Sequence, residues 1–202
     1  MNDQIFEAVV TTQSPSGQPH VAPMGVRYQG GQVVLMPFRP STTLDNILAT
    51  GCAVLNRVVD GRVYAGCVTG RKQWPLQPVV VPGGAGFAGQ RRGGALSHQA
   101  LRLLRDDGHP QRPTLWLAVA HEAQHAPFLG LNRAQAAVLE GAVLVSRLHL
   151  LPRDKISAEM AYLRIAIDKT AGPDEHQAWG WLTDAVAQHA AAMASAPEGL
   201  PP

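Results

Sequence analysis

Cysteine, charge and aromatic residues are all scarce in this chain. Of its 202 residues, 2 are cysteines, 16% are charged and 5% are aromatic. Cys52 and Cys67 cannot build a disulfide framework, and each lies in an apolar stretch, so we expect two reduced thiols. With 46% hydrophobic residues and so little charge, the composition excludes a solvated, disordered chain.

An excess of charge and long apolar runs are missing as well. Lys and Arg number 17 against 15 Asp and Glu, so the net charge of +2 gives no reason to expect nucleic acid or an anionic membrane as partner. No run of about 20 apolar residues occurs, because Gln135 and Glu140 interrupt the best candidate. Glu7 already interrupts the first hydrophobic run. We therefore expect a cytoplasmic protein with no membrane partner.

The first part of the chain has the pattern of short β-strands. Residues 5–12, 21–28, 33–38 and 52–59 are rich in β-branched and apolar residues and are separated by turn-forming sequences. Gly30-Gly31 is a hairpin signal between two of these runs. The short spacing predicts an antiparallel meander that curls into a barrel.

Other segments of the same region have different patterns. The spacing of apolar residues predicts a helix over residues 41–50, which Gly51 can end. A short strand is expected at residues 79–81 inside a Gly/Pro-rich loop, and a buried strand at residues 114–120. Residues 97–105 fit a helix or a strand equally well.

From Asn132 onward the pattern becomes helical. Asn132 is a good N-cap, and apolar stripes then predict three helices, with breaks at Pro152 and at Gly172-Pro173. The predicted fold class is therefore α+β, a barrel followed by a C-terminal helical region. We divide the chain into a barrel domain at residues 1–127, a helical region at residues 128–196 and a frayed tail at residues 197–202.

Residues 121–125 match the zinc-binding pattern H-E-x-x-H. On a helix, His121 and His125 would share one face and bind zinc, with Glu122 as general base. The residues before the motif favour a strand, and Pro127 would end a zinc-binding helix early. We therefore expect a strand end and a loop and assign no metal ligand, and a zinc-dependent hydrolase is kept as the weaker alternative.

Residues 84–89 match the dinucleotide-binding pattern G-x-G-x-x-G. A dinucleotide fold needs a helix after this motif, but Gly93-Gly94 would each cost about 1 kcal/mol there. No βαβ alternation surrounds the motif. A loop is therefore the preferred interpretation.

The segment at residues 37–43, Pro-Phe-Arg-Pro-Ser-Thr-Thr, ends a predicted strand and opens a predicted helix. A helix N-terminus offers free N–H groups and the positive end of the helix dipole, which suit an anion. Simple capping would explain one hydroxyl, whereas the segment offers three hydroxyls and Arg39. The pattern favours a phosphate site, although Asp45 one turn later opposes it.

Two segments together carry a resemblance to a known family. Residues 19–26, Pro-His-Val-Ala-Pro-Met-Gly-Val, and residues 41–47 with 53–56 resemble the flavin reductase-like split barrels. The chain resembles still more an uncharacterised archaeal and bacterial family of FMN-binding split-barrel proteins, catalogued as a domain of unknown function. In that family a helical region with an Asn-Arg-Ala start, as at residues 132–134, follows the barrel. The resemblance is weakest over residues 70–111.

The resemblance implies a split barrel that binds FMN as cofactor, in a homodimer with the cofactor partly at the subunit interface. It places the backbone of residues on the first segment at the flavin ring, and hydroxyl and amide side chains at the phosphate and ribityl end. The candidate cofactor-binding residues are Ala22, Met24, Gly25, Val26, Phe38, Arg39, Ser41, Thr42, Thr43, Asn46 and Asn56.

Three hypotheses of function follow. The first is an FMN-dependent oxidoreductase that passes electrons or hydride from a reduced nicotinamide to a small acceptor. The second is a non-enzymatic flavin carrier or sensor, and the third is the zinc hydrolase. The cofactor would supply the redox chemistry, and no side chain stands out as a catalytic residue.

Overall fold

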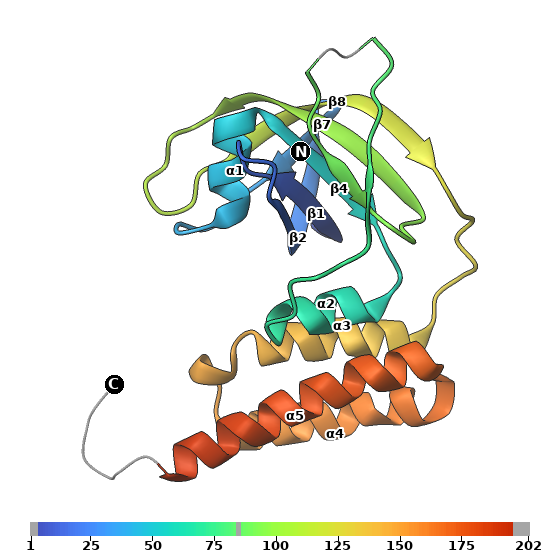
Figure 1. Cartoon of the computed structure of the whole chain (residues 1–202). Helices are drawn as coiled ribbons and strands as arrows, with labels where there is room; N and C mark the ends of the chain where they lie inside the picture. The colour runs from blue at the N-terminus through green and yellow to red at the C-terminus, as the bar shows by residue number, and fades with distance from the viewer. Residues whose placement is uncertain (1–3, 84–85, 196–202) are drawn as a thin grey trace. The chain divides into compact units, whose positions relative to one another are not determined.

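The computed structural model describes residues 4–83 and 86–195. Strands dominate up to residue 124 and helices dominate after it (Figure 1). The strands are β1 (Phe6–Gln13), β2 (Pro19–Gln29), β3 (Gln32–Leu35), β4 (Cys52–Arg57), β5 (Leu76–Pro78), β6 (Gln90–Arg92), β7 (Ser97–Asp106) and β8 (Leu115–Gln124). The helices are α1 (Thr42–Thr50), α2 (Gly61–Val68), α3 (Arg133–Val145), the 3₁₀ turn η1 (Leu148–Leu150), α4 (Arg153–Thr170) and α5 (Pro173–Ser195).

Six of these strands close into an antiparallel barrel in the order β1-β2-β3-β8-β7-β4. The β2–β3 hairpin turns at Gly30 and Gly31, whose φ angles of 57° and 76° are those of a two-residue primed turn. The barrel closes where β4 returns to β1, with Val10 opposite Leu55. The predicted barrel is thus confirmed, and residues 97–105, which fitted either type of structure, lie in β7.

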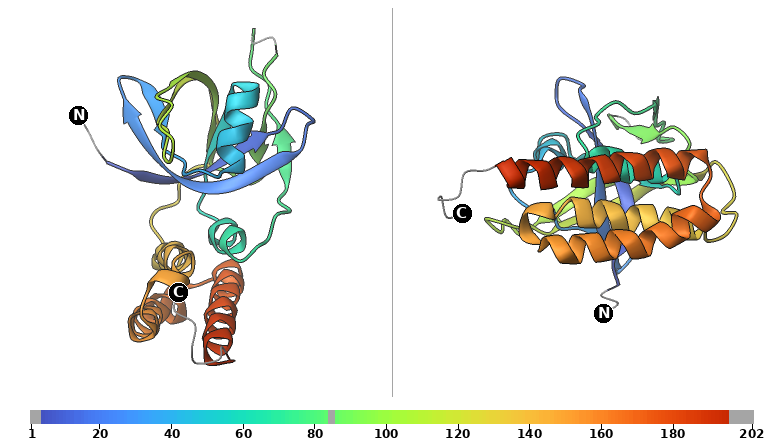
Figure 2. Two further views of the ribbon diagram at one scale, coloured as in Figure 1. Left: turned by 90° about the vertical axis from the view of Figure 1, so that its left-hand side faces the viewer. Right: turned by 90° about the horizontal axis from the view of Figure 1, so that it is seen from below.

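The barrel interior is filled by aliphatic side chains from every strand. Helix α1 contributes Leu44 and Ile47 to this core and ends at Gly51, whose φ of 68° is left-handed (Figure 2, left). Fully buried core residues include Val10, Val26, Val33, Leu35, Leu55, Leu101, Leu115 and Leu117. The expected helix and its expected stop are both confirmed.

The Gly/Pro-rich segment between α2 and β7 covers part of the outer face of the barrel. Val79 packs there against Val54 and Ala100, and Gly89 allows close approach, because an added Cβ would lie 2.9 Å from Val54. The expected strand at residues 79–81 is wrong in position, since the pairing forms between β5 and β6 instead. In the described part of the G-x-G-x-x-G segment, residues 86–89, no helix begins, and strand β6 follows.

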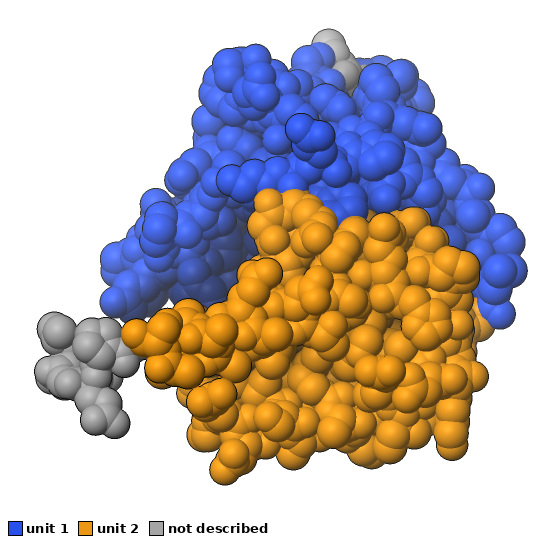
Figure 3. Space-filling view, turned by 60° about the horizontal axis from the view of Figure 1, so that its bottom comes forward, with its two compact units in different colours: residues 1–59, 72–129 blue, residues 60–71, 130–202 orange. Residues whose placement is uncertain are grey.

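The chain separates into two compact units (Figure 3). The barrel unit comprises Met1–Val59 and Lys72–Leu129, and the helical unit comprises Asp60–Arg71 and Gly130–Pro202. Helix α2 is not predicted from the sequence. It lies within residues 1–127, the predicted barrel domain, but belongs to the helical unit. Its first residue is capped by the Asp60 carboxylate, which accepts a hydrogen bond from the Arg62 N–H at 3.0 Å.

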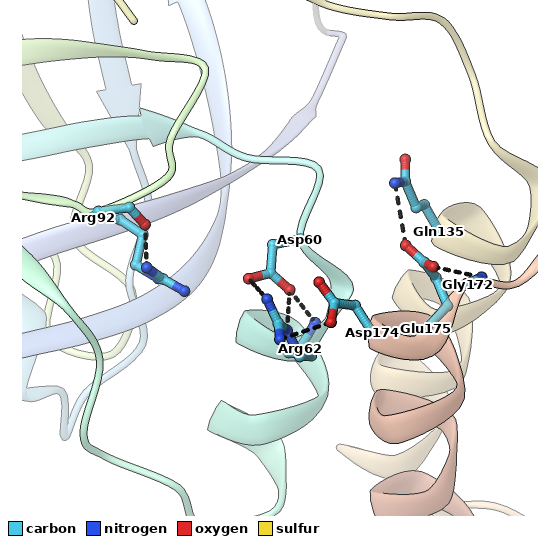
Figure 4. Close-up of polar contacts among 8 residues, drawn as sticks. Asp60, Arg62, Arg92, Gln135, Gly172, Asp174 and Glu175 are labelled. Carbon is cyan, nitrogen blue, oxygen red and sulfur yellow. Dashed lines mark hydrogen bonds and ion pairs between the residues drawn. The ribbon is translucent and has the colours of Figure 1, made fainter. Parts of the chain in front are cut away.

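Within the helical unit, α3, α4 and α5 lie side by side (Figure 2, right). Asn132 caps α3, as predicted, by accepting hydrogen bonds from the backbone N–H groups of residues 134 and 135. Arg62 on α2 pairs with both Asp60 and Asp174, the latter at 2.8 Å (Figure 4). Glu175 binds the Gly172 N–H and the Gln135 amide, which links the start of α5 to α3 (Figure 4).

None of the helices in the described part of the chain has the length and hydropathy that a membrane crossing requires. The tail that we expected to fray, residues 197–202, lies outside the described residues.

Candidate functional site

A cavity of about 480 Å³ lies between strand β2 and the start of helix α1, and we call it the β2–α1 cavity. Its volume is in the range of roughly 300–1,000 Å³ that small-molecule sites occupy. Seven of the predicted cofactor-binding residues line it, namely Ala22, Met24, Gly25, Phe38, Ser41, Thr42 and Thr43. Two segments nominated from sequence alone therefore meet in one site.

The β2 wall of the cavity is mainly apolar. Met24 packs against the barrel core, and the Ile5 side chain packs closely on Gly25 next to it, since an added Cβ would lie 2.8 Å from Ile5 Cγ2. His20 adds a ring on the same strand. Burial lowers the pKa of His20, and the positive charge of Lys72 lowers it further, so this imidazole is neutral at physiological pH.

The α1 wall offers hydrogen-bond donors. Ser41 is the N-cap, and its Oγ accepts a hydrogen bond from the Leu44 N–H at 3.3 Å. The N–H groups of Thr42 and Thr43 lie in the first turn, where no intrahelical acceptor exists, and they donate to no other residue in the described structure. Two free N–H groups beside two threonine hydroxyls form a cradle that suits an anion.

The cations of this cavity come from residues that sequence reasoning missed. Arg112, on the loop between β7 and β8, lies over the Phe38 ring at 4.5 Å and donates from Nε to the Met36 carbonyl at 3.4 Å. Arg27 reaches the cavity from β2 and contacts Met36 Sδ. No local signal marks Arg112, because only the pairing of β3 with β8 brings its loop to the site.

Four predicted residues do not line the β2–α1 cavity. Val26 is buried in the barrel core, and Arg39 is exposed, with its backbone N–H donating to the Gln111 carbonyl at 2.8 Å. Asn46 is buried and donates to Thr12 Oγ1 at 3.0 Å. Asn56 is buried, and its side chain already bonds strands β1, β4 and β6. The amide side chains of Asn46 and Asn56 thus hold the barrel together in this structure.

The H-E-x-x-H segment is a strand end, as expected. His121 and Glu122 are successive residues of β8, so their side chains point to opposite faces, and no helix brings His121 and His125 together. His125 instead stacks on His98, with 2.8 Å between its Nε2 and His98 Nδ1. Among residues 4–83 and 86–195, no three potential ligands converge on one point where a metal ion could bind.

The His98–His125 pair is neutral in the folded protein. Burial, together with the positive charges of His125 and Arg91, lowers the pKa of His98 to about 4. Burial also lowers the pKa of His125, and Arg91 adds to the effect. Because the two rings share one hydrogen bond, one nitrogen must donate and the other accept, which a doubly protonated pair could not do.

Comparisons with solved structures agree with this architecture. An FMN-bound protein from Methanosarcina mazei is 20% identical over 91% of this chain and 96% of its own, with a TM-score of 0.77. A 2-nitrobenzoate 2-nitroreductase from Pseudomonas fluorescens is 18% identical over 62% of this chain and 66% of its own, with a TM-score of 0.51. A flavoredoxin from Methanosarcina acetivorans is 11% identical over 64% of this chain and 76% of its own, with a TM-score of 0.51. At these identities the likeness shows a shared fold, the split barrel.

Family models give a more direct assignment. No curated protein sequence matches the chain. The model described as the N-terminal domain of a protein of unknown function, DUF447, matches residues 6–126, and the companion DUF447 model matches residues 132–184. Together they cover most of the chain, including both the barrel and the helices. The chain therefore belongs to the DUF447 family, as its sequence resemblance implied.

Proposed function

We propose that this protein is a flavoprotein that binds FMN in the β2–α1 cavity. The observation that supports it is the meeting of a mainly apolar β2 wall with an anion cradle at the start of α1. FMN has both parts, a flat ring system and a phosphate, separated by a ribityl chain. The FMN bound in the M. mazei family member supports the same choice of ligand.

In this proposal the chain's own residues position the cofactor. The backbone of Ala22, Met24 and Gly25 faces the flavin ring, and the Thr42 and Thr43 hydroxyls with their N–H groups hold the phosphate. Arg112 supplies the positive charge, because its stacking on Phe38 and its bond to Met36 fix its guanidinium at the cavity wall. When bound, FMN would supply the redox chemistry.

We further propose that the protein acts as an oxidoreductase, taking electrons or hydride from a reduced nicotinamide and passing them to a small acceptor. The P. fluorescens nitroreductase, which shares the fold, supports an oxidoreductase role, and NADH or NADPH distinguishes it from a carrier. We expect NADH or NADPH to reduce the bound flavin. The reduction is measured as a loss of the visible absorbance of the flavin. A flavin that neither nucleotide reduces would favour the carrier or sensor.

A test of the phosphate site uses the difference between FMN and riboflavin, which lacks the phosphate. Replacing Thr42 and Thr43 together by Ala removes two hydroxyl donors, each contributing roughly 1.5–3 kcal/mol to a charged acceptor. We expect at least ~10²-fold weaker FMN binding with little change for riboflavin. Ser41 remains as the helix cap in this variant, so any fall in the melting temperature of the flavin-free protein would come from the loss of the buried Thr43 side chain and not from the cap.

Two arginine variants sharpen the same test. Arg112→Ala should weaken FMN binding more than riboflavin binding, whereas Arg39→Ala, an exposed arginine outside the cavity, serves as the matched control. If the ratio of FMN to riboflavin affinity is the same in the wild type and the threonine double variant, the phosphate does not bind at α1 and the proposed site is wrong.

The zinc hypothesis is tested on the same protein. We expect His121→Ala and His125→Ala to leave flavin binding intact, because neither residue lines the β2–α1 cavity. Stoichiometric zinc in the purified protein, lost in either variant, would instead support a zinc hydrolase.

We also propose that the protein is a homodimer in which the partner covers the apolar rim of this cavity. Phe38 and Ile5 line the cavity, yet 63% and 50% of their surfaces are exposed. Large apolar side chains at a ligand site are commonly covered by a partner. Sedimentation at micromolar concentration should give a dimer, and a monomer that still holds FMN would contradict the proposal.

A further inference from the structure

A second cavity, of about 550 Å³, opens at the end of the barrel where β1 begins and where β2, β4 and β8 end. We call it the barrel-end cavity. It shares no lining residue with the β2–α1 cavity, and its volume also falls within the range of roughly 300–1,000 Å³ of small-molecule sites. The proposed flavin chemistry leaves this cavity without a role.

The inner part of the barrel-end cavity is apolar. Ala8, Val26 and Leu55 of the barrel core form its floor. Phe6 and Tyr28 stand beside it as an edge-to-face pair with ring centroids 5.8 Å apart, and Phe128 is 57% exposed on the rim. Aromatic side chains around an apolar floor suit a flat ring, which can pack against them face-on or edge-on.

The rim carries a fixed polar group. Arg57 donates from Nη1 to Ser97 Oγ at 3.1 Å and to Glu122 Oε1 at 3.3 Å, and from Nη2 to the Tyr28 hydroxyl at 3.2 Å. These three bonds orient the guanidinium, while its Nε makes no hydrogen bond to any residue that the structure describes. An oriented donor next to an apolar hollow is the arrangement that gives a small-molecule site its specificity.

Acceptors lie beside this donor. The other carboxylate oxygen of Glu122 accepts a hydrogen bond from Gln99, and about half of the Glu122 side chain remains exposed to a ligand. Gln99 is 6% exposed, and its Oε1 finds no donor within the described structure. Gln99 does not itself line the cavity, so the Glu122 carboxylate is the acceptor that a ligand beside Arg57 would meet.

Charge decides what kind of ligand fits. Arg57 is already paired with the half-exposed Glu122 carboxylate, so a ligand carboxylate or phosphate placed beside Arg57 would also meet the negative charge of Glu122. A neutral group that carries an acceptor next to a donor meets both Arg57 and Glu122 without that repulsion. We propose that the barrel-end cavity binds a small aromatic carboxamide, with its ring against Phe6, Tyr28 and Phe128 and its amide between Arg57 and Glu122.

The test uses benzamide as probe and benzoate as its charged counterpart, titrated into the full chain and followed by NMR. We expect benzamide to bind with a Kd on the order of 1 mM, as its few heavy atoms allow, and benzoate roughly tenfold more weakly. Phe128→Ala should weaken benzamide binding about fivefold through lost ring contact. Leu129→Ala is the matched control, because Leu129 is adjacent, 95% exposed and outside the cavity lining.

Glu122→Gln removes the negative charge of this side chain while keeping its size, so it tests the contribution of charge to ligand choice. It should narrow the difference in affinity between benzamide and benzoate, because the carboxylate that repels benzoate is gone. The proposal is overturned if benzamide does not bind, if benzoate binds as tightly, or if Phe128→Ala and Leu129→Ala behave alike. It is also overturned if saturating FMN displaces benzamide, since the probe would then occupy the flavin site.

Discussion

The barrel unit and the helical unit are each stabilised internally by a different kind of contact. In the barrel unit, buried polar side chains join strands that are far apart in sequence, as Asn56 does for β1, β4 and β6. In the helical unit, caps act on neighbouring residues and glycines let helices approach, as where an added Cβ on Gly61 would lie 2.8 Å from Val138 Cγ1. An asparagine whose side chain connects several distant strands should therefore contribute several times more to the free energy of unfolding than one that makes a single local contact.

The largest effect should come from Asn56→Ala in the barrel. The amide donates to the Val9 and Val54 carbonyls and to Thr11 Oγ1, and its oxygen accepts from the Arg92 N–H at 2.7 Å. Removing it leaves buried groups without partners, so we expect a loss of roughly 3 kcal/mol or more in the free energy of unfolding.

Asn46→Ala is the control for this prediction, because Asn46 is also buried and, within the described part of the chain, its side chain makes one hydrogen bond, to Thr12 Oγ1. Its cost should be nearer ~1 kcal/mol. Both variants are compared by urea unfolding without flavin. Equal losses would show that the connection between strands adds nothing beyond burial of an amide.

The next effect, in the helical unit, concerns close approach of helices. Gly61→Ala places a methyl group against Val138, a buried core residue with no room to move, and should cost about 1–3 kcal/mol. Gly180→Ala, inside α5, meets nothing within 4 Å and should instead stabilise the protein by up to ~1 kcal/mol. A lower melting temperature for Gly61→Ala and a higher one for Gly180→Ala would confirm the α2–α3 contact, whereas a stabilised Gly61→Ala variant would contradict it.

The same contrast explains what the sequence could and could not predict. Local signals succeeded: the Gly30-Gly31 turn, the Gly51 stop and the Asn132 cap each act within a few residues, and all three are where the sequence placed them. Helix α2 was missed because its residues are few and its stability comes from packing on α3 and α5. The strand predicted at residues 79–81 does not form there because Val79 and Val81 pack on the outer barrel wall while Val80 is exposed.

The candidate site follows the same rule. Seven of the residues predicted from the sequence line the β2–α1 cavity. They come from two segments that are close in the chain, because the short strand β3 alone separates β2 from the start of α1. Arg112 lies some 70 residues further along the chain from Ser41, and only the pairing of β3 with β8 brings it near. Asn46 and Asn56 match the resemblance as amides, but barrel contacts occupy their side chains.

A smaller, pH-dependent effect belongs to the barrel. His98 has a folded pKa of about 4, below the ordinary 6.5, so the unfolded chain takes up this proton first as the pH falls. The stability that neutral His98 provides is therefore complete above pH 6.5 and is lost as the pH falls from 6.5 towards 4. The difference between the two pKa values corresponds to roughly 3 kcal/mol, and because the neighbouring His125 is exposed we expect solvent screening to leave a loss on the order of 1–2 kcal/mol over that range.

His98→Asn should flatten this part of the pH profile of urea unfolding. His176→Asn is the control, because His176 is an exposed residue of the helical unit. If the free energy of unfolding falls equally steeply between pH 6.5 and pH 4 in the two variants, the His98–His125 pair does not account for the acid sensitivity.

The smallest effect should come from the capping asparagine of the helical unit. Asn132 accepts hydrogen bonds from the N–H groups of Ala134 and Gln135 at 2.8 and 3.2 Å, and its amide donates to the Thr170 carbonyl at 3.1 Å. Asn132→Ala should cost ~1 kcal/mol, because water can reach the helix end and Thr170 Oγ1 still accepts from the Ala134 N–H at 3.0 Å. Asn132→Ser restores a capping oxygen without the bond to Thr170 and should recover most of the loss.

Urea unfolding of both variants beside Asn56→Ala then compares a local cap with a connection between distant strands. A cost for Asn132→Ala as large as that for Asn56→Ala would mean that the bond to Thr170, and not the cap, holds α3 to the end of α4.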